Sequence, residues 1–93
     1  MAEFERDAAK AAANRRKHGV GFEFATAAFR DMFAIEWLDD REHHGEARMV
    51  LLGMAEGTLL VVVHVERGDR VRLISARRAT RNEQDLYFRE NGA

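Results

Sequence analysis

Residues 58–76 read TLLVVVHVERGDRVRLISA, and this stretch decides the fold. Residues 58–65 are almost continuously apolar and rich in β-branched side chains, a composition typical of a central strand buried on both faces. Residues 70–76 alternate arginines with apolar residues, as a strand with one covered face does. The residues between them, ERGD, predict a turn. The stretch therefore predicts an antiparallel hairpin at the centre of a sheet.

The direction of His64 depends on the length of this turn. A three-residue turn at 66–68, with its glycine left-handed, places His64 opposite Arg70 on the face of the arginines. A two-residue turn at 67–68 places it opposite Val71, on the core side. We expect the three-residue turn, because glycine then occupies the position that needs a positive φ. His64 is thus a candidate for catalysis, with a packed core residue as the alternative.

The sequence before the hairpin predicts an edge strand and a pair of helices. Phe4 belongs to a short edge strand, and Asp7 has the position of a helix N-cap. The alanine-rich residues 8–18 suit a helix that ends at Gly19. Residues 21–31 carry apolar side chains at helical spacing and predict a second, short helix.

Two further strands and a closing helix complete the expected fold. Residues 33–38 and 47–53 read as strands joined by a polar, acidic loop, and Thr80 with Glu83 forms a capping box that begins a last helix. We therefore expect one α+β domain over residues 1–93, with an N-terminal helix pair, an antiparallel β-meander and a closing C-terminal helix. The helices are expected to pack against one side of the sheet.

Composition excludes several classes of protein. The chain has 93 residues, a formal net charge of −1 and no cysteine, which excludes disulfides and thiolate metal sites. Its longest apolar run is far shorter than the roughly 20 residues of a membrane helix, and no secretory signal is visible. His43 and His44 are adjacent in the acidic loop, but their spacing matches no metal motif. We expect a cytoplasmic protein without membrane contact, metal or cofactor.

Charge is segregated along the chain. Residues 67–81 carry six arginines and one acid, whereas residues 36–46 carry five acids and one arginine. Because Arg70 and Arg72 alternate with apolar residues, both project to the sheet face that the helices leave uncovered. Arg48 shows the same alternation in its own strand. We therefore expect a basic sheet face that holds its arginines towards an anion.

Several stretches of the chain, in order, resemble the BrnT family of type II toxins: KAAANRRKHGVGFEFATAAF, GEARMVLLG, LLVVVHVERGDRVRLISARRATRNE and the closing LYF. The most specific parts are NxxKHGV, the G-E-x-R stretch before a strand, and E-R-G-D-R-x-R-x-I-S-A-R-x-A-T-R. The acidic loop at residues 41–44 departs from the family pattern.

The resemblance implies a RelE-like ribonuclease fold and a toxin that cuts RNA and halts translation. It also implies a cognate antitoxin, BrnA, whose ribbon-helix-helix part binds DNA, so that the toxin reaches operator DNA only through the antitoxin. Two toxins with two antitoxins are the complex that the resemblance implies.

The residue types independently suit metal-free RNA cleavage. This reaction deprotonates the ribose 2′-hydroxyl, neutralises a phosphorane and protonates the leaving 5′-oxygen. Arginines suit the second task because their planar fork holds phosphate oxygens, while histidine or carboxylate suits the proton transfers. The arginines expected to clamp the phosphate are Arg48, Arg70, Arg72 and Arg77. The candidates for proton transfer are Glu46, His18 and His64, and the further RNA contacts expected are Arg16, Lys17, Arg67 and Arg78.

The alternative function is non-catalytic. The chain is then a small binding module, or a toxin relic that acts with a DNA-binding antitoxin as co-repressor. In that case the face that carries the arginines binds the antitoxin or DNA phosphate without catalysis. Cleavage of RNA by the purified protein separates the two functions.

Overall fold

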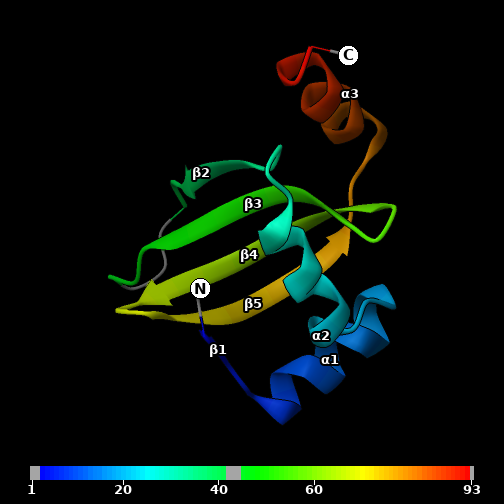
Figure 1. Cartoon of the computed structure of the whole chain (residues 1–93). Helices are drawn as coiled ribbons and strands as arrows, with labels where there is room; N and C mark the ends of the chain where they lie inside the picture. The colour runs from blue at the N-terminus through cyan, green and yellow to red at the C-terminus, as the bar shows by residue number, and fades with distance from the viewer. Residues whose placement is uncertain (1–2, 42–44, 93) are drawn as a thin grey trace.

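The computed structural model describes residues 3–41 and 45–92, and contains one five-stranded mixed sheet with helices on both sides (Figure 1). The elements in chain order are β1 (Glu3–Glu5), α1 (Ala8–His18), α2 (Phe22–Ala25), the 3-10 helix η1 (Thr26–Arg30), β2 (Ile35–Asp39), β3 (Arg48–Ala55), β4 (Thr58–Arg67), β5 (Arg70–Arg78) and α3 (Arg81–Glu90). The predicted α+β architecture is confirmed. His43 and His44, in the predicted acidic loop, lie outside the described residues.

The strands follow the order β1-β5-β4-β3-β2, so the continuous apolar run of β4 is the central strand, as its sequence predicts. β2 to β5 form the predicted antiparallel meander. The edge strand predicted at Phe4 also forms, but β1 runs parallel to β5, with Glu3 beside Arg70 and Glu5 beside Arg72. The sheet is therefore mixed.

Local capping signals fix the helix ends. The Asp7 carboxylate accepts a hydrogen bond of 3.0 Å from the backbone N–H of Lys10, and Gly19 ends α1 in the left-handed conformation with φ 71°. Thr80 and Glu83 form both hydrogen bonds of the predicted capping box. Each of these ends was predicted from residue type alone.

The turn between β4 and β5 differs from the prediction. Arg67 pairs directly with Arg70, so the turn consists of Gly68 and Asp69, and the predicted three-residue turn is wrong. Gly68 is left-handed, with φ 66°, and it occupies the first turn position, as in hairpin turns of the II′ class. The glycine is left-handed as predicted, but it is the first residue of the turn and not the third.

The same hairpin contains a bulge. Val63 pairs with Ser75, whereas His64 pairs with Leu73, so Ile74 is an extra residue in β5. The bulge resets the alternation of β5 halfway along the strand. As a result, Arg77 returns to the face of Arg72 although the two are an odd number of residues apart.

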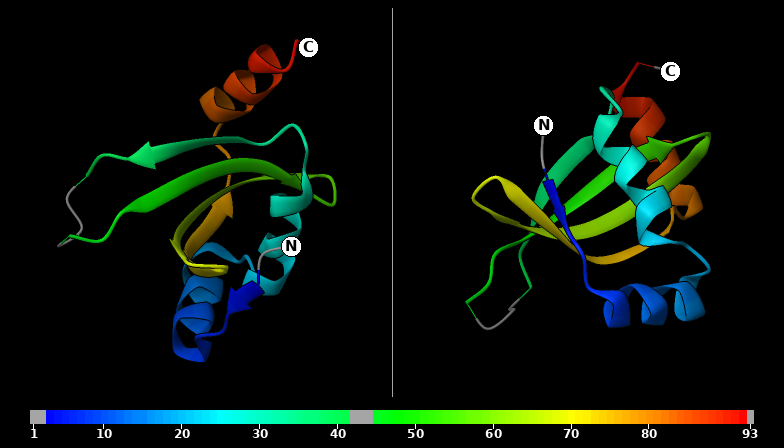
Figure 2. Two further views of the ribbon diagram at one scale, coloured as in Figure 1. Left: turned by 60° about the vertical axis from the view of Figure 1, so that its left-hand side comes forward. Right: turned by 60° about the horizontal axis from the view of Figure 1, so that its bottom comes forward.

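The helices lie on both faces of the sheet, and the prediction of one helical side is wrong. Figure 2 shows α1, α2 and η1 on one side and α3 on the other. The second face carries its own apolar residues, with Leu52 and Val61 at its centre, and Tyr87 of α3 packs against them. Alternation in β3 and β4 gives both faces an apolar set, so both need a cover.

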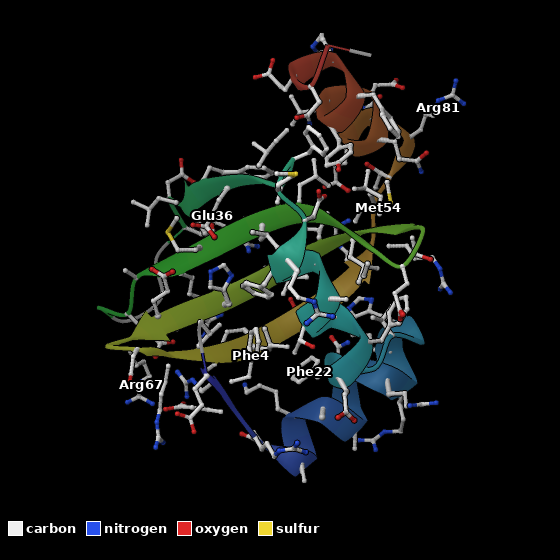
Figure 3. The ribbon with its side chains drawn as sticks, in the orientation of Figure 1. Phe4, Phe22, Glu36, Met54, Arg67 and Arg81 are labelled. Carbon is white, nitrogen blue, oxygen red and sulfur yellow. The ribbon has the colours of Figure 1, made fainter. Side chains whose placement is uncertain are left out.

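The face under α1, α2 and η1 forms the larger core cluster. Its buried strand residues include Leu60, Val62 and Leu73, and Phe4 and Phe22 pack against the cluster between helices and sheet (Figure 3). A close contact sets the spacing here, because a Cβ on Gly53 of β3 would lie 2.8 Å from the carbonyl oxygen of Ala28. In the described residues, no helix is long and apolar enough to cross a membrane.

A buried amide ties α1 to the sheet. The Asn14 side chain donates to the carbonyl of Ala76 at 2.9 Å and accepts from its N–H at 3.0 Å. It also donates to the carbonyl of Val20 at 3.0 Å. The single asparagine of α1 thus satisfies both backbone groups of one β5 residue and anchors the loop that follows the helix.

Candidate functional site

The arginines predicted to share one face of the sheet do so. Val71 and Leu73 belong to the core under α1 and α2, so the alternating Arg70 and Arg72 project to the opposite face. Arg48, the first residue of β3, contacts the same carboxylate as Arg72 and therefore lies on this face. We call the surface formed by these three arginines the basic face.

Glu46 is at the centre of the basic face. Arg72 Nη2 donates to Glu46 Oε2 at 2.5 Å, and Arg48 Nε donates to Glu46 Oε1 at 3.4 Å. The side chains of these three residues remain 25–32% exposed, so the cluster is open to a ligand. Among the described residues, Arg72 Nε has no acceptor although it is buried, which leaves the guanidinium with unused donor capacity.

The sequence explains how this cluster forms. Glu46 immediately precedes β3 and Arg48 begins it, while Arg72 comes from β5 on the far side of β4. Val65 of β4 pairs with Arg72 and is buried. The G-E-x-R stretch and the alternating arginines of β5 are therefore brought together across the central strand.

Arg77 has a different environment. The register of β5 places Arg77 on the same face as Arg72. However, its two terminal nitrogens each donate to one oxygen of Glu83 at 2.8 Å. The hydrogen bond from Arg77 lowers the pKa of Glu83 to about 2, with the capping contacts of Thr80 acting in the same direction. Arg77 therefore holds the start of α3, and its fork is occupied within the fold.

Three of the four further RNA contacts predicted, and the proton-transfer candidate His18, lie away from the basic face. Arg16, Lys17 and His18 belong to the last turn of α1, on the opposite side of the sheet. Arg78 pairs with Leu60, which belongs to the α1-side core, and it lines a depression with Arg15 of α1. Alternation places Arg78 on the other face from its neighbour Arg77, so the double arginine is divided between the two sides.

Arg67 and Arg70 occupy the tip of the β4–β5 hairpin. They are direct partners across the ladder and both are exposed. Arg67 Nη1 lies 3.7 Å from a carboxylate oxygen of Glu5 in β1. An exposed pair at this distance is weak, so Arg67 extends the basic face from Arg70 towards the hairpin tip.

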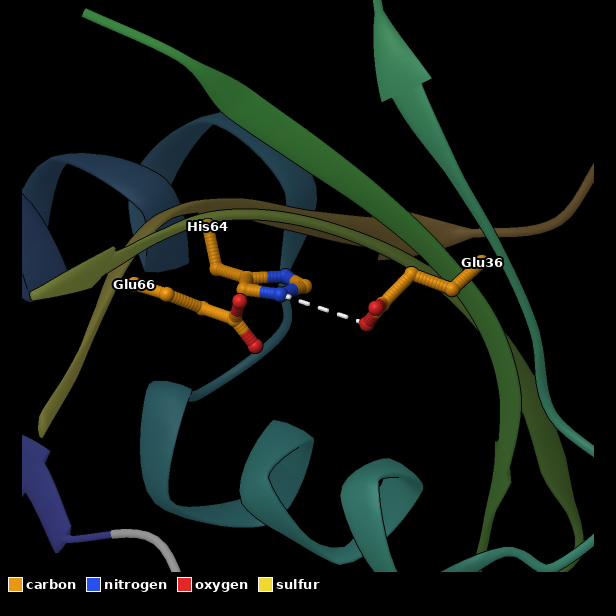
Figure 4. A group of neighbouring side chains, drawn as sticks. All are labelled: Glu36, His64 and Glu66. Carbon is orange, nitrogen blue, oxygen red and sulfur yellow. Dashed lines mark ion pairs between the residues drawn. The ribbon is translucent and has the colours of Figure 1, made fainter. Parts of the chain in front are cut away.

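His64 is not part of the basic face. It has no exposed surface and lies on the face covered by α1, α2 and η1, where its ring packs edge to face against Phe29 at a centroid distance of 4.9 Å. Its Nε2 is 3.4 Å from Glu36 Oε2 (Figure 4). Burial lowers the pKa of the imidazole despite the neighbouring carboxylates of Glu36 and Glu66.

The position of His64 follows from the turn. The expected turn set it opposite Arg70, whereas the two-residue turn at residues 68–69 sets it opposite Leu73, on the core side. The prediction that it faces the arginines is wrong, and the alternative of a packed core residue is confirmed in its geometry. Among the predicted proton-transfer residues, only Glu46 contacts the clamp arginines in the described part of the chain.

One residue beside the basic face was absent from the predicted site. Trp37 of β2 pairs with Val50, and its neighbour on the same face, Asp39, pairs with Arg48. The indole is 37% exposed, so an aromatic surface lies beside the arginines. The sequence signal for Trp37 was the alternation of side chains within β2, because Trp37 lies two residues from Asp39, the partner of Arg48.

Comparison with protein-family models gives a match over residues 7–83, to a family described as the ribonuclease toxin BrnT of type II toxin-antitoxin systems. No match is found among curated proteins. The matched span begins at the N-cap of α1 and ends at Glu83, so it includes Asn14, Glu46 and all arginines of the basic face. The chain therefore belongs to the BrnT family of type II ribonuclease toxins.

Proposed function

We propose that the protein is a metal-independent endoribonuclease that cleaves messenger RNA on its basic face and thereby inhibits translation. The observation that carries this proposal is the Glu46 carboxylate held between the guanidinium groups of Arg48 and Arg72 on an open surface. A carboxylate in a fork of two arginines occupies the place that a phosphate group can take. RNA then displaces Glu46 from the arginines and leaves it beside the bound phosphate.

The reaction uses the groups already present. Glu46 takes the proton of the ribose 2′-hydroxyl, and the 2′-oxygen attacks the phosphorus atom. Arg48 and Arg72 neutralise the additional negative charge of the phosphorane, which arginines do without losing a proton. The bond to the 5′-oxygen breaks, and that oxygen takes a proton from water. The products are a 2′,3′-cyclic phosphate and a free 5′-hydroxyl.

The surroundings of the cluster support an RNA substrate. Arg70 is exposed beside Arg72 and extends the positive surface along β5, where it contributes to phosphate binding. Trp37 offers a partly exposed indole on which a base can stack. Arg77 contributes by fixing α3, because its donors are bound to Glu83.

Purified protein incubated with single-stranded RNA in EDTA tests the proposal. Cleavage is expected in EDTA and is expected to disappear in Arg72→Ala and Glu46→Gln, with products that carry cyclic phosphate ends. Arg81→Ala is the matched control, since this arginine is 87% exposed and pairs only loosely with Asp85 at 3.6 Å. Undiminished cleavage in Arg72→Ala, or cleavage that requires added metal, contradicts the proposal. Folded protein that binds RNA without cutting it supports a non-catalytic module.

Membership of a type II family implies an antitoxin partner. We propose that this partner is a BrnA-like ribbon-helix-helix protein, that two toxins bind two antitoxins, and that operator DNA is contacted through the antitoxin. We place the free toxin in the cytoplasm, where its RNA substrate is. Co-expression with the product of the adjacent gene, followed by size-exclusion chromatography with light scattering, gives the mass of the complex. A toxin that remains a lone monomer in this experiment contradicts the proposed assembly.

A further inference from the structure

A second group of polar side chains lies on the opposite side of the sheet from the basic face. Glu36 of β2 and Glu66 of β4 converge on His64 of β4 from either side (Figure 4). One carboxylate oxygen of each glutamate and one ring nitrogen of the histidine all lie within 4.8 Å of one another. The three residues therefore present one nitrogen and two oxygen donors to the same small space.

His64 is the unusual member of this group. Its side chain is fully buried, and neither ring nitrogen has a hydrogen-bond partner within the described residues. Nε2 lies 3.4 Å from Glu36 Oε2, but this contact lacks the geometry of a hydrogen bond. Buried polar atoms in folded proteins are almost always satisfied, whereas this imidazole has only a weak backbone contact with Val62 and the neighbouring Glu36 carboxylate.

The neighbouring side chains do not neutralise the negative charge of the two glutamates. Phe29 covers the imidazole edge to face and Phe4 packs edge to face on Phe29, so an apolar wall backs the histidine. Within residues 3–41 and 45–92, no lysine or arginine forms an ion pair with Glu36 or Glu66. Both glutamates are exposed, so a dissolved ion reaches their carboxylates directly, and it reaches the buried Nε2 once the side chains over the imidazole move.

We propose that Glu36, His64 and Glu66 bind a divalent transition-metal ion, with Zn²⁺ as the preferred occupant. One imidazole and two carboxylates form a mixed nitrogen and oxygen donor set, which suits Zn²⁺, whereas Mg²⁺ prefers oxygen donors alone. Zinc bonds to nitrogen and to carboxylate oxygen are about 2.0–2.2 Å long. The donor atoms lie within 4.8 Å of one another, so an ion bound at Nε2 requires the two exposed glutamate side chains to rotate until their oxygens reach that distance. Water completes the coordination.

The topology indicates what the ion does. β2 is the edge strand and β4 the central strand, with β3 between them, so an ion held by Glu36 and His64 links the edge of the sheet to its centre. Arg48 and Arg72 lie on the other face. The ion is therefore expected to stabilise the fold and to take no part in RNA cleavage, and this inference does not depend on the proposed function.

Untagged full-length protein, dialysed against EDTA and then freed of chelator, tests the site. Titration calorimetry is expected to show one Zn²⁺ per chain, and Zn²⁺ at about 100 times its Kd is expected to raise Tm by roughly 10 °C. Mg²⁺ at the same concentration is expected to leave Tm unchanged. Co²⁺ gives an independent readout, because its visible absorption changes when an imidazole coordinates it.

Three variants assign the ligands. Glu36→Gln and Glu66→Gln replace exposed side chains and are expected to keep the fold, and each is expected to weaken Zn²⁺ binding at least tenfold. His64→Gln is expected to abolish it; if this buried substitution unfolds the chain, the two glutamate variants decide. The matched control is the double variant His43→Gln/His44→Gln, which is expected to bind Zn²⁺ as the parent does. No saturable Zn²⁺ binding, binding that survives in both glutamate variants, or binding lost in the control overturns the proposal.

Discussion

Arg72 and Arg77 lie on the same face of β5, and each forms its main contact with a glutamate. Glu83, the partner of Arg77, is held at both oxygens and also caps α3. Glu46, the partner of Arg72, is shared with Arg48 and lies on an open surface. The first pair is therefore part of the fold, while the second is available to a ligand. Residue type and sheet face are the same in both cases, and the difference lies in what else the glutamate holds.

The largest effect is expected from Arg72→Ala. Removing a preorganised donor to a developing negative charge reduces catalytic rates by about 10²–10³-fold. RNA cleavage is expected to fall by that factor, with growth inhibition lost in cells, while Tm stays within a few degrees. Arg72→Lys is expected to lose most of the activity too, because lysine has no planar fork. A folded Arg72→Ala protein with full toxicity removes Arg72 from the site.

Arg77→Ala is expected to show the reverse pattern. It breaks two charge-assisted hydrogen bonds and leaves Glu83 without its main partner, so the free energy of unfolding is expected to fall by about 1–2 kcal/mol after allowance for partial solvent exposure. Urea denaturation measures this change. Cleavage by the folded fraction is expected to remain within about threefold of the parent at low temperature, a rate ratio equivalent to less than 1 kcal/mol. Loss of cleavage at unchanged stability instead places Arg77 in the phosphate clamp.

Tyr87→Phe tests whether α3 has a second, separate anchor. The Tyr87 hydroxyl donates to Asp31 Oδ2 at 2.6 Å, and burial together with this bond raises the pKa of Tyr87 to about 12. Removing the hydroxyl is expected to cost about 1 kcal/mol of unfolding free energy. The double variant with Arg77→Ala is expected to be additive in thermal or urea denaturation, since the two anchors share no partner. Strong non-additivity shows that they act as one unit.

The smallest effect is a dependence of stability on acid pH. The pKa of Glu83 is about 2 in the folded chain against an ordinary value of 4.5, so the unfolded state binds more protons between these values. The contribution of Glu83 is therefore complete above pH 4.5 and is lost as pH falls towards 2. Denaturation of the parent and of Arg77→Ala across this range is expected to give converging stabilities at low pH. Parallel curves exclude the Arg77–Glu83 pair as the cause.

Local features of the fold were predictable from sequence because their causes are local. Asp7 and Gly19 mark the ends of α1 through contacts within one turn, and the alternation of Arg70 and Arg72 needs only that β5 is a strand. The basic face could be predicted for the same reason. Its central carboxylate, Glu46, was among the candidates, although nothing in the sequence ranked it above His18 or His64.

Features that depend on distant contacts were not predictable. The bulge at Ile74 is a property of the pairing of β5 with β4, and it changes the faces of all later residues. The side taken by α3 depends on Tyr87 meeting Asp31, 56 positions earlier. His64 was misplaced for a similar reason, since one residue of difference in a turn moves a side chain to the other face.

The Asn14 amide has a consequence for the association of the sheet with other chains. A side-chain amide carries the same donor and acceptor as a peptide group, and it is bound to the outward-facing backbone groups of Ala76, where the three-residue β1 no longer covers β5. At that residue, the amide takes the place that a sixth strand would occupy. A second copy of the domain, or any extended peptide, therefore finds no free backbone donor or acceptor there. One asparagine thus prevents another strand from pairing with the sheet at this part of its edge.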